Sequence, residues 1–320
     1  MLDRLKGRGA NGSNGEKVGE KIGLGSIRRP VIGLALGGGA ARGFAHIGIL
    51  RTLIANGIVP DVVVGTSIGA VVGGAYAAGQ LDAFEEWGRS LQGVRNILGY
   101  LDIRLNGSGL IGGEKLATRL EEAMGQTLVE DLPVKFATVA TEVRTGHEIW
   151  LTRGRVVDAM RASYALPGIF SPVLIGDRWL VDGALVNPVP VSVCRAYEQP
   201  MVVAVNLHYD LFGRAAVIKH SAGELMIQKD AARPTRHDPN ATAQGTRLGI
   251  TGMMVEAFNI IQDRISRARL AGDPPDLSLQ PKLGHVGLTE FHRADEAIRL
   301  GYEATMAHVD ELRRLQAVLA

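Results

Sequence analysis

The sequence is short of cysteine: its 320 residues include only Cys194, which excludes a disulfide bond within the chain. A lone thiol is typical of proteins from a reducing compartment, so we expect a cytoplasmic protein. The neighbours of Cys194 in 190–193 are mostly apolar, and its side chain is therefore expected to pack as a small hydrophobic group.

Long apolar runs and a strong net charge are also missing. No hydrophobic stretch approaches the ~20 residues that cross a bilayer, and the first residues lack the apolar core of a signal peptide. We expect any membrane contact to be peripheral, at the inner face. The formal net charge of +2 and the aromatic content of 5%, with no interleaving of aromatic and basic residues, argue against a nucleic-acid partner.

Two segments have the composition of exposed chain. Residues 1–28 are rich in Gly, Asn, Lys and Glu, lack periodicity and carry more basic than acidic residues, which predicts a flexible basic N-terminal tail. Residues 213–247 are polar and include Pro234 and Pro239, so we predict an inserted surface loop or lid there. The rest of 29–320 is expected to form one domain.

The ordered part opens with alternating strands and helices. Pro30–Leu36 is a short apolar run, Ala41–Asn56 has apolar residues at helical spacing, and Val62–Val64 is a second apolar run before another helix. This β-α-β-α order predicts the α/β fold class, with a mainly parallel central sheet flanked by helices. Strands buried on both faces read as continuous apolar runs, as these do.

Less regular patterns predict the remaining elements. Helices are expected at 84–98, 114–124, 156–164, 248–271 and 293–319, the last interrupted by Gly301, and strands at 136–143, 148–152, 179–181 and 201–207. The amphipathic C-terminal helix is compatible with a homodimer.

The stretch Gly65-Thr66-Ser67-Ile68-Gly69 lies between the second strand and its helix. A serine between glycines on such a turn is the arrangement of a nucleophile elbow, in which Gly65 and Gly69 would leave room for a tight backbone. The pentapeptide alone leaves open a packed turn whose serine caps the helix. The flanking strand and helix favour the nucleophile.

A first glycine cluster, Gly37–Gly39, follows the first strand. It could cradle a phosphate or form an oxyanion hole. The dinucleotide fingerprint fails because Arg42 occupies its last glycine position, and a phosphate-binding Walker loop fails at Gly43-Phe44. We therefore favour an oxyanion hole built by Gly37, Gly38 and Gly39, with Arg42 organising the loop rather than forming a surface ion pair.

A serine nucleophile needs a base, and none of the downstream histidines stands in a distinctive setting. His46 is expected to be a packed or surface residue of the first helix. Asp182 follows the apolar strand 179–181 and precedes Gly183-Ala184, which places it at a strand end. A buried carboxylate there could take the serine proton. The alternative is a turn aspartate that binds backbone N–H groups.

The glycine cluster with Arg42-Gly43, the elbow and the Asp182 turn occur in an order and spacing that resemble the patatin-like phospholipases. The resemblance covers about 31–207 and continues more weakly through 283–302. It implies a three-layer fold and a serine–aspartate dyad without histidine, with Ser67 as nucleophile and Asp182 as base. Ser163 and Pro167, in a further similar segment, are expected to be wall and packing residues.

The resemblance also implies the reaction. It points to hydrolysis of lipid acyl esters, of the phospholipase A, lysophospholipase or carboxylesterase type, with no metal and no cofactor. The apolar segments Leu166–Leu174 and Phe258–Ile265 are candidates for an acyl groove, with ordinary core packing as the alternative. Two other functions stay open: a non-catalytic lipid-binding regulatory protein of the same fold, and a phosphate- or nucleotide-binding protein that uses the Gly37–Gly39 loop.

Overall fold

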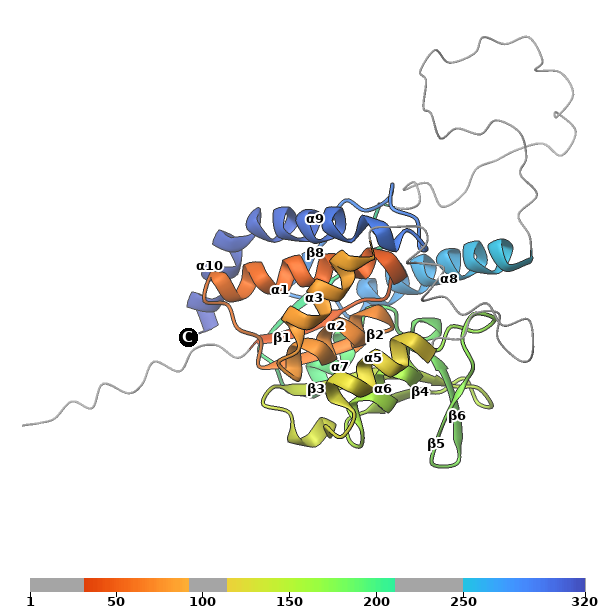
Figure 1. The fold of residues 1–320 in the computed structure, drawn as a ribbon. Coiled ribbons are helices and arrows are strands. Elements are labelled where there is room, and N and C mark those ends of the chain that lie inside the picture. Colours follow the sequence, from red (N-terminus) through yellow and green to blue (C-terminus); the bar gives the residue numbers. More distant parts are fainter. Residues whose placement is uncertain (1–31, 92–113, 211–249, 320) are drawn as a thin grey trace, which may run out of the picture.

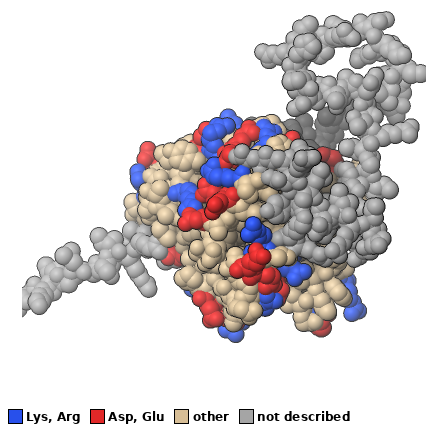
Figure 2. All heavy atoms as spheres, in the orientation of Figure 1, with Lys and Arg blue, Asp and Glu red and all other residues tan. Residues whose placement is uncertain are grey.

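The computed structural model describes residues 32–91, 114–210 and 250–319. The tail predicted at 1–28 and the insertion predicted at 213–247 lie outside these residues. Over the described part, no helix combines the length and apolar character needed to cross a bilayer. On the face drawn in Figure 2, basic and acidic side chains are interspersed, without a continuous patch of one sign.

The domain is built on one mixed sheet with the order β5-β6-β3-β2-β1-β7-β8, in which β4 pairs with β3 outside this path. The parallel part consists of β3 (Lys135–Glu142), β2 (Val62–Thr66), β1 (Ile32–Leu36), β7 (Met201–Val205) and β8 (Leu277–Leu279). The antiparallel part consists of β4 (Glu148–Leu151), β5 (Val173–Ile175) and β6 (Arg178–Asp182). The predicted mainly parallel sheet is confirmed.

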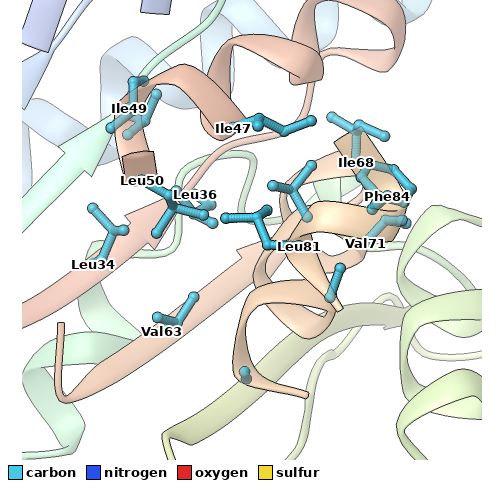
Figure 3. Close-up of a cluster of buried hydrophobic side chains, with 14 of the residues drawn as sticks. Leu34, Leu36, Ile47, Ile49, Leu50, Val63, Ile68, Val71, Leu81 and Phe84 are labelled. Carbon is cyan, nitrogen blue, oxygen red and sulfur yellow. The ribbon is translucent and has the colours of Figure 1, made fainter. Parts of the chain in front are cut away.

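Helices cover both faces of the sheet, because successive residues of each central strand point to opposite sides. Leu34 and Leu36 of β1 pack into the larger core cluster (Figure 3), whereas Ala35 belongs to a second cluster on the other face. The larger cluster includes residues of α1 (Ala45–Ala55), α2 (Ile68–Ala77), α3 (Leu81–Ser90), α5 (Glu114–Met124), α6 (Val156–Tyr164), α9 (Ala294–Met306) and α10 (Val309–Leu319). The second cluster includes residues of α7 (Val191–Ala196), with Cys194 buried in it as expected, and Leu270 of α8 (Ile250–Gly272) packs against it.

Several element boundaries differ from the sequence-based ones. The helix predicted at 41–56 begins as a 3-10 turn over Ala40–Phe44 and continues as α1. The helix predicted at 84–98 is α3, which begins at Leu81 and ends at Ser90. The short elements β5, β8 and α7 were not predicted, because segments of three to six residues carry little periodicity.

The C-terminal helix is not interrupted at Gly301, and that prediction is wrong. α9 runs through Gly301, and the break lies at 307–308, before α10. Gly301 and Gly48 instead let α9 and α1 lie against each other (Figure 1). A Cβ added at Gly301 would lie 2.1 Å from the Ala45 carbonyl oxygen, and one at Gly48 would lie 1.9 Å from the Ile298 oxygen. Backbone contact between the helices therefore requires glycine at both positions.

We predict that Gly48→Ala destabilises the protein, although alanine favours an isolated helix over glycine by about 1 kcal/mol. The added methyl group must push two backbones apart, and the expected loss of unfolding free energy is about 1–3 kcal/mol. Urea denaturation measures this loss. Gly272→Ala is the matched control, since nothing lies within 4 Å of its added Cβ. Equal stability of the two variants would contradict the packing argument.

Candidate active site

Ser67 lies at the sharp turn between β2 and α2, with a φ of 56° and a ψ of −124°. A non-glycine residue in this region is uncommon and is often associated with a functional site. The flanking glycines make the turn possible. A Cβ at Gly65 would lie 2.4 Å from the backbone nitrogen of Ala70, and a Cβ at Gly69 would lie 2.2 Å from the Leu36 carbonyl oxygen.

The Ser67 hydroxyl donates a hydrogen bond to Asp182 Oδ2 over 2.7 Å, although 115 positions separate the two residues. The sheet brings them together. β2 pairs with β3 through Thr66 and Val139, and β6 pairs with the same strand through Asp182 and Ala140. Ser67 follows the strand on one side of β3 and Asp182 ends the strand on the other side, and both lie next to the same point of β3.

The Asp182 carboxyl group is buried, with an exposed fraction of 1%. Burial raises its pKa from an ordinary 3.8 to about 7, against the opposing effect of hydrogen bonds from the Ala184 N–H and the Ser67 hydroxyl. The Ala184 N–H donates to Oδ1 over 2.8 Å, which leaves Oδ2 directed at the serine. A carboxylate of this basicity is suited to accept a proton near neutral pH.

The glycine loop at the end of β1 does not offer all of its N–H groups to a ligand. The Gly37 N–H donates to the Val205 carbonyl over 3.1 Å, and the Gly38 N–H donates to the Pro188 carbonyl over 3.0 Å. The N–H groups of Gly39 and Ala40 have no acceptor among the described residues. Both residues line the same cavity as Ser67. The geometry thus favours Gly39 and Ala40 as donors, with Gly37 and Gly38 holding the loop.

The side chain of Arg42 links the glycine loop to a segment far along the chain. Its side chain is buried, and its Nε donates to the Val286 carbonyl over 2.7 Å. The Ala41 N–H donates to the Leu288 carbonyl over 3.1 Å, which ties the loop to the same distant segment. The alternative of a surface ion pair at Arg42 is wrong, because the guanidinium lies inside the protein.

Two residues for which the sequence predicted no more than packing or surface roles support the site. His46 is fully buried, and its Nε2–H donates to the Gly37 carbonyl over 2.8 Å, while burial lowers its pKa to about 4 and keeps the ring neutral. Ser163 is more than a wall residue. Its hydroxyl accepts the Ser67 N–H over 2.9 Å and donates to the Val139 carbonyl over 2.6 Å. Neither contact follows from local sequence.

Ser67 and Asp182 open into a cavity of about 90 Å³. Leu166 and Phe258 line both this cavity and an adjoining apolar groove of about 190 Å³. The groove is therefore lined by parts of the two segments expected to hold an acyl chain. A larger cavity of about 380 Å³ lies between α3 and α5 and contains none of the predicted site residues. Within the described ranges, no cluster of three or more His, Cys, Asp or Glu side chains could hold a metal ion.

We predict that Ser163→Ala destabilises the elbow. The change leaves the Ser67 N–H and the Val139 carbonyl without their present partner, and each buried group without a partner costs about 1–3 kcal/mol. Urea denaturation is the measurement. Ser192→Ala serves as the control, because among the described residues this partly buried hydroxyl accepts only the Asn187 amide, over 3.2 Å. A loss at Ser163 no larger than that at Ser192 would contradict the supporting role.

We also predict that the stability of Asp182→Asn increases relative to that of the unchanged protein as the pH rises from 5 to about 7. The raised pKa means that the folded protein holds a proton that the unfolded chain has already released, so its stability falls as pH rises between about 4 and 7. Asparagine has no such titration. Melting temperatures of both proteins from pH 5 to 8 test this, and a constant difference would refute it.

Comparison with known proteins identifies the chain's relatives. The sequence pattern described as patatin-like phospholipase matches residues 34–195. An uncharacterized NTE family protein of Mycobacterium tuberculosis is 30% identical over 322 residues, covering 85% of this chain and 89% of that protein. A lysophospholipase of Pyricularia oryzae, NTE1, is 26% identical over 88% of this chain and 18% of its own length.

Comparison with solved structures gives a weaker match. The crystal structure of VipD from Legionella pneumophila has a TM-score of 0.44 and 13% identity, covering 88% of this chain and 67% of that one. The sequence matches are the stronger finding, since they span the glycine loop, the elbow and the Asp182 turn. The protein therefore belongs to the patatin-like phospholipase family.

Proposed function

We propose that this protein hydrolyses acyl esters of lipids through Ser67 as nucleophile and Asp182 as general base. The observation that supports this most is the 2.7 Å hydrogen bond from the Ser67 hydroxyl to the buried Asp182 carboxylate, beside an apolar groove. Family membership supports the same class of reaction.

In the first half of the reaction, Ser67 Oγ attacks the ester carbonyl carbon while its proton passes to Asp182 Oδ2. The N–H groups of Gly39 and Ala40, which line the cavity, stabilise the negative oxygen that forms. The N-terminus of α2, which begins at Ile68, adds a favourable partial positive charge. The bond to the alcohol then breaks, and Asp182 returns the proton to the leaving oxygen.

In the second half, water replaces the alcohol. One water proton passes to Asp182 as the water oxygen attacks the acyl carbon, and the bond from that carbon to Ser67 Oγ breaks. Asp182 then returns the proton to Oγ. The products are a carboxylic acid and the starting enzyme, so every proton taken up by Asp182 is given back.

The groove determines the proposed substrate class. Leu166 and Phe258 connect it to the catalytic cavity, and its other walls include Ile169, Leu185 and Met254. An acyl chain seated there would place its ester carbonyl beside Ser67. The proposal covers phospholipids, lysophospholipids and simpler carboxylic esters. The name of the Pyricularia relative, a lysophospholipase, supports a lipid ester.

The rim of the groove supports peripheral contact with a lipid surface. The helix α8 that borders the groove has four exposed apolar side chains, namely Met253, Met254, Ile260 and Ile261. Met254 and Ile261 also line the groove itself. Exposed apolar side chains beside a binding groove are typical of interaction surfaces.

We predict that Ser67→Ala lowers turnover of p-nitrophenyl butyrate by about 10⁴-fold or more, since removal of the nucleophile ends the reaction pathway. A fluorophosphonate probe should label the unchanged protein and not this variant. Ser192→Ala, which alters a serine outside the cavity, should label and turn over normally. Because Asp182 must be ionised to act, kcat/KM should rise with pH and reach half its maximum near 7. Activity that survives in Ser67→Ala would end the serine mechanism.

A further inference from the structure

The side of α8 that faces the protein interior is polar. Asn259, Gln262, Asp263 and Ser266 are all at least nine-tenths buried, and their spacing of three and four residues places them on one side of the helix. Asp263 pairs with Arg267 over 2.9 Å. The other three side chains each keep a buried oxygen atom, Asn259 Oδ1, Gln262 Oε1 and Ser266 Oγ, with no partner in the described part of the protein.

Such a helix face is costly, because each buried polar atom without a partner disfavours folding by about 1–3 kcal/mol. An apolar stripe would be the ordinary solution for a helix against a sheet. Buried polar atoms without protein partners are the usual binding points of ordered water or of a ligand. The polar side of α8 therefore points to a role for at least one of these residues beyond packing.

Gln262 is the member of this group that reaches the catalytic cavity. It lines the cavity together with Ser67 and Asp182. A Cβ built on Gly38 would lie 3.1 Å from Gln262 Oε1 and 3.5 Å from Ser67 Cβ, so the amide approaches the space between the glycine loop and the serine.

In this cavity, the Oε1 atom of Gln262 has no hydrogen-bond partner among the described residues. Tyr164, another polar residue of the lining, interacts electrostatically with Arg161, which opposes the rise in pKa that burial gives its hydroxyl. Asp182 is bonded to Ser67 and to the Ala184 N–H. By contrast, Gln262 Oε1 has no partner among the described residues, and the exposed fraction of the whole Gln262 residue is 2%.

The second half of the proposed reaction needs an acceptor of this kind. The attacking water gives one proton to Asp182, and its second hydrogen then needs an acceptor in a cavity whose lining is mainly apolar. An acceptor for that hydrogen fixes the orientation of the water, so that its lone pair faces the acyl carbon. The first half has no such need, because Asp182 and Ser163 already orient Ser67.

We infer that Gln262 is a positioning residue for the hydrolytic water, an assignment that rests on the proposed function. Its Oε1 accepts one water hydrogen while the other passes to Asp182 and the water oxygen bonds to the acyl carbon. The bond from that carbon to Ser67 Oγ then breaks, and the proton moves from Asp182 to Oγ. Gln262 gains and loses no proton.

Gln262→Met tests this inference, because methionine keeps the length of the side chain and removes the amide. With p-nitrophenyl butyrate, the rate of the first turnover and of fluorophosphonate labelling should stay within about twofold of the unchanged protein. The steady-state kcat should fall about tenfold or more, which produces a burst of p-nitrophenol. Intact-protein mass spectrometry should show the acylated enzyme accumulating.

Ser266→Ala is the matched control, because it removes another unpartnered oxygen from the same side of α8 outside the cavity. Ser266→Ala should leave both the rate of the first turnover and the steady-state kcat unchanged. In Gln262→Met, added methanol should also divert a larger share of product to the methyl ester, since water loses its positioned advantage. If Gln262→Met does not fold, Gln262→Ala is read in the same way.

The outcomes separate the two proposals. An unchanged kcat, or an equal fall in the acylation and hydrolysis rates of Gln262→Met, would overturn the positioning role while leaving the serine mechanism intact. Absence of turnover and labelling in the unchanged protein would overturn the proposed function and the inference with it.

Discussion

A hydrogen bond of 2.7 Å between the Ser67 hydroxyl and the Asp182 carboxylate is the contact on which the candidate site depends. The register of the sheet sets it, because β3 pairs with the strand that precedes Ser67 on one side and with the strand that ends in Asp182 on the other. Thr141 adds a hydrogen bond to the Asp182 carbonyl over 2.9 Å. Burial then makes the carboxyl group basic enough to act near neutral pH.

Close backbone packing is the second constraint. At Gly65 and Gly69 it permits the turn that exposes Ser67, and at Gly48 and Gly301 it lets α1 and α9 touch. Hydrogen bonds hold the glycine loop in place. They come from the Gly37 and Gly38 N–H groups and from the buried side chains of Arg42 and His46. A rigid loop can present the remaining N–H groups without rearranging during the reaction, which is what electrostatic stabilisation of an oxyanion requires.

In the proposed mechanism, α8 takes part both in substrate recognition and in the reaction. Phe258 and Met254 supply apolar walls of the groove, while Gln262, on the polar side of the same helix, reaches the cavity of Ser67. Under the two proposals, one helix offers an apolar surface to an acyl chain and a hydrogen-bond acceptor to water. Because both features belong to a single rigid element, their spacing relative to the Ser67–Asp182 pair is set by how α8 packs on the sheet.

The sequence by itself determined the α/β class, the elbow, the glycine loop and the Asp182 turn, because strand and helix periodicity and glycine-dependent turns are local properties. Only the tertiary structure decided that the Gly37 and Gly38 N–H groups are already bonded, that Ser163 supports Ser67, and that α9 passes through Gly301. It also decided that Gln262 lines the cavity that contains Ser67 and Asp182. These contacts join residues far apart in the chain, and sheet register and helix packing, which no local pattern encodes, bring them together.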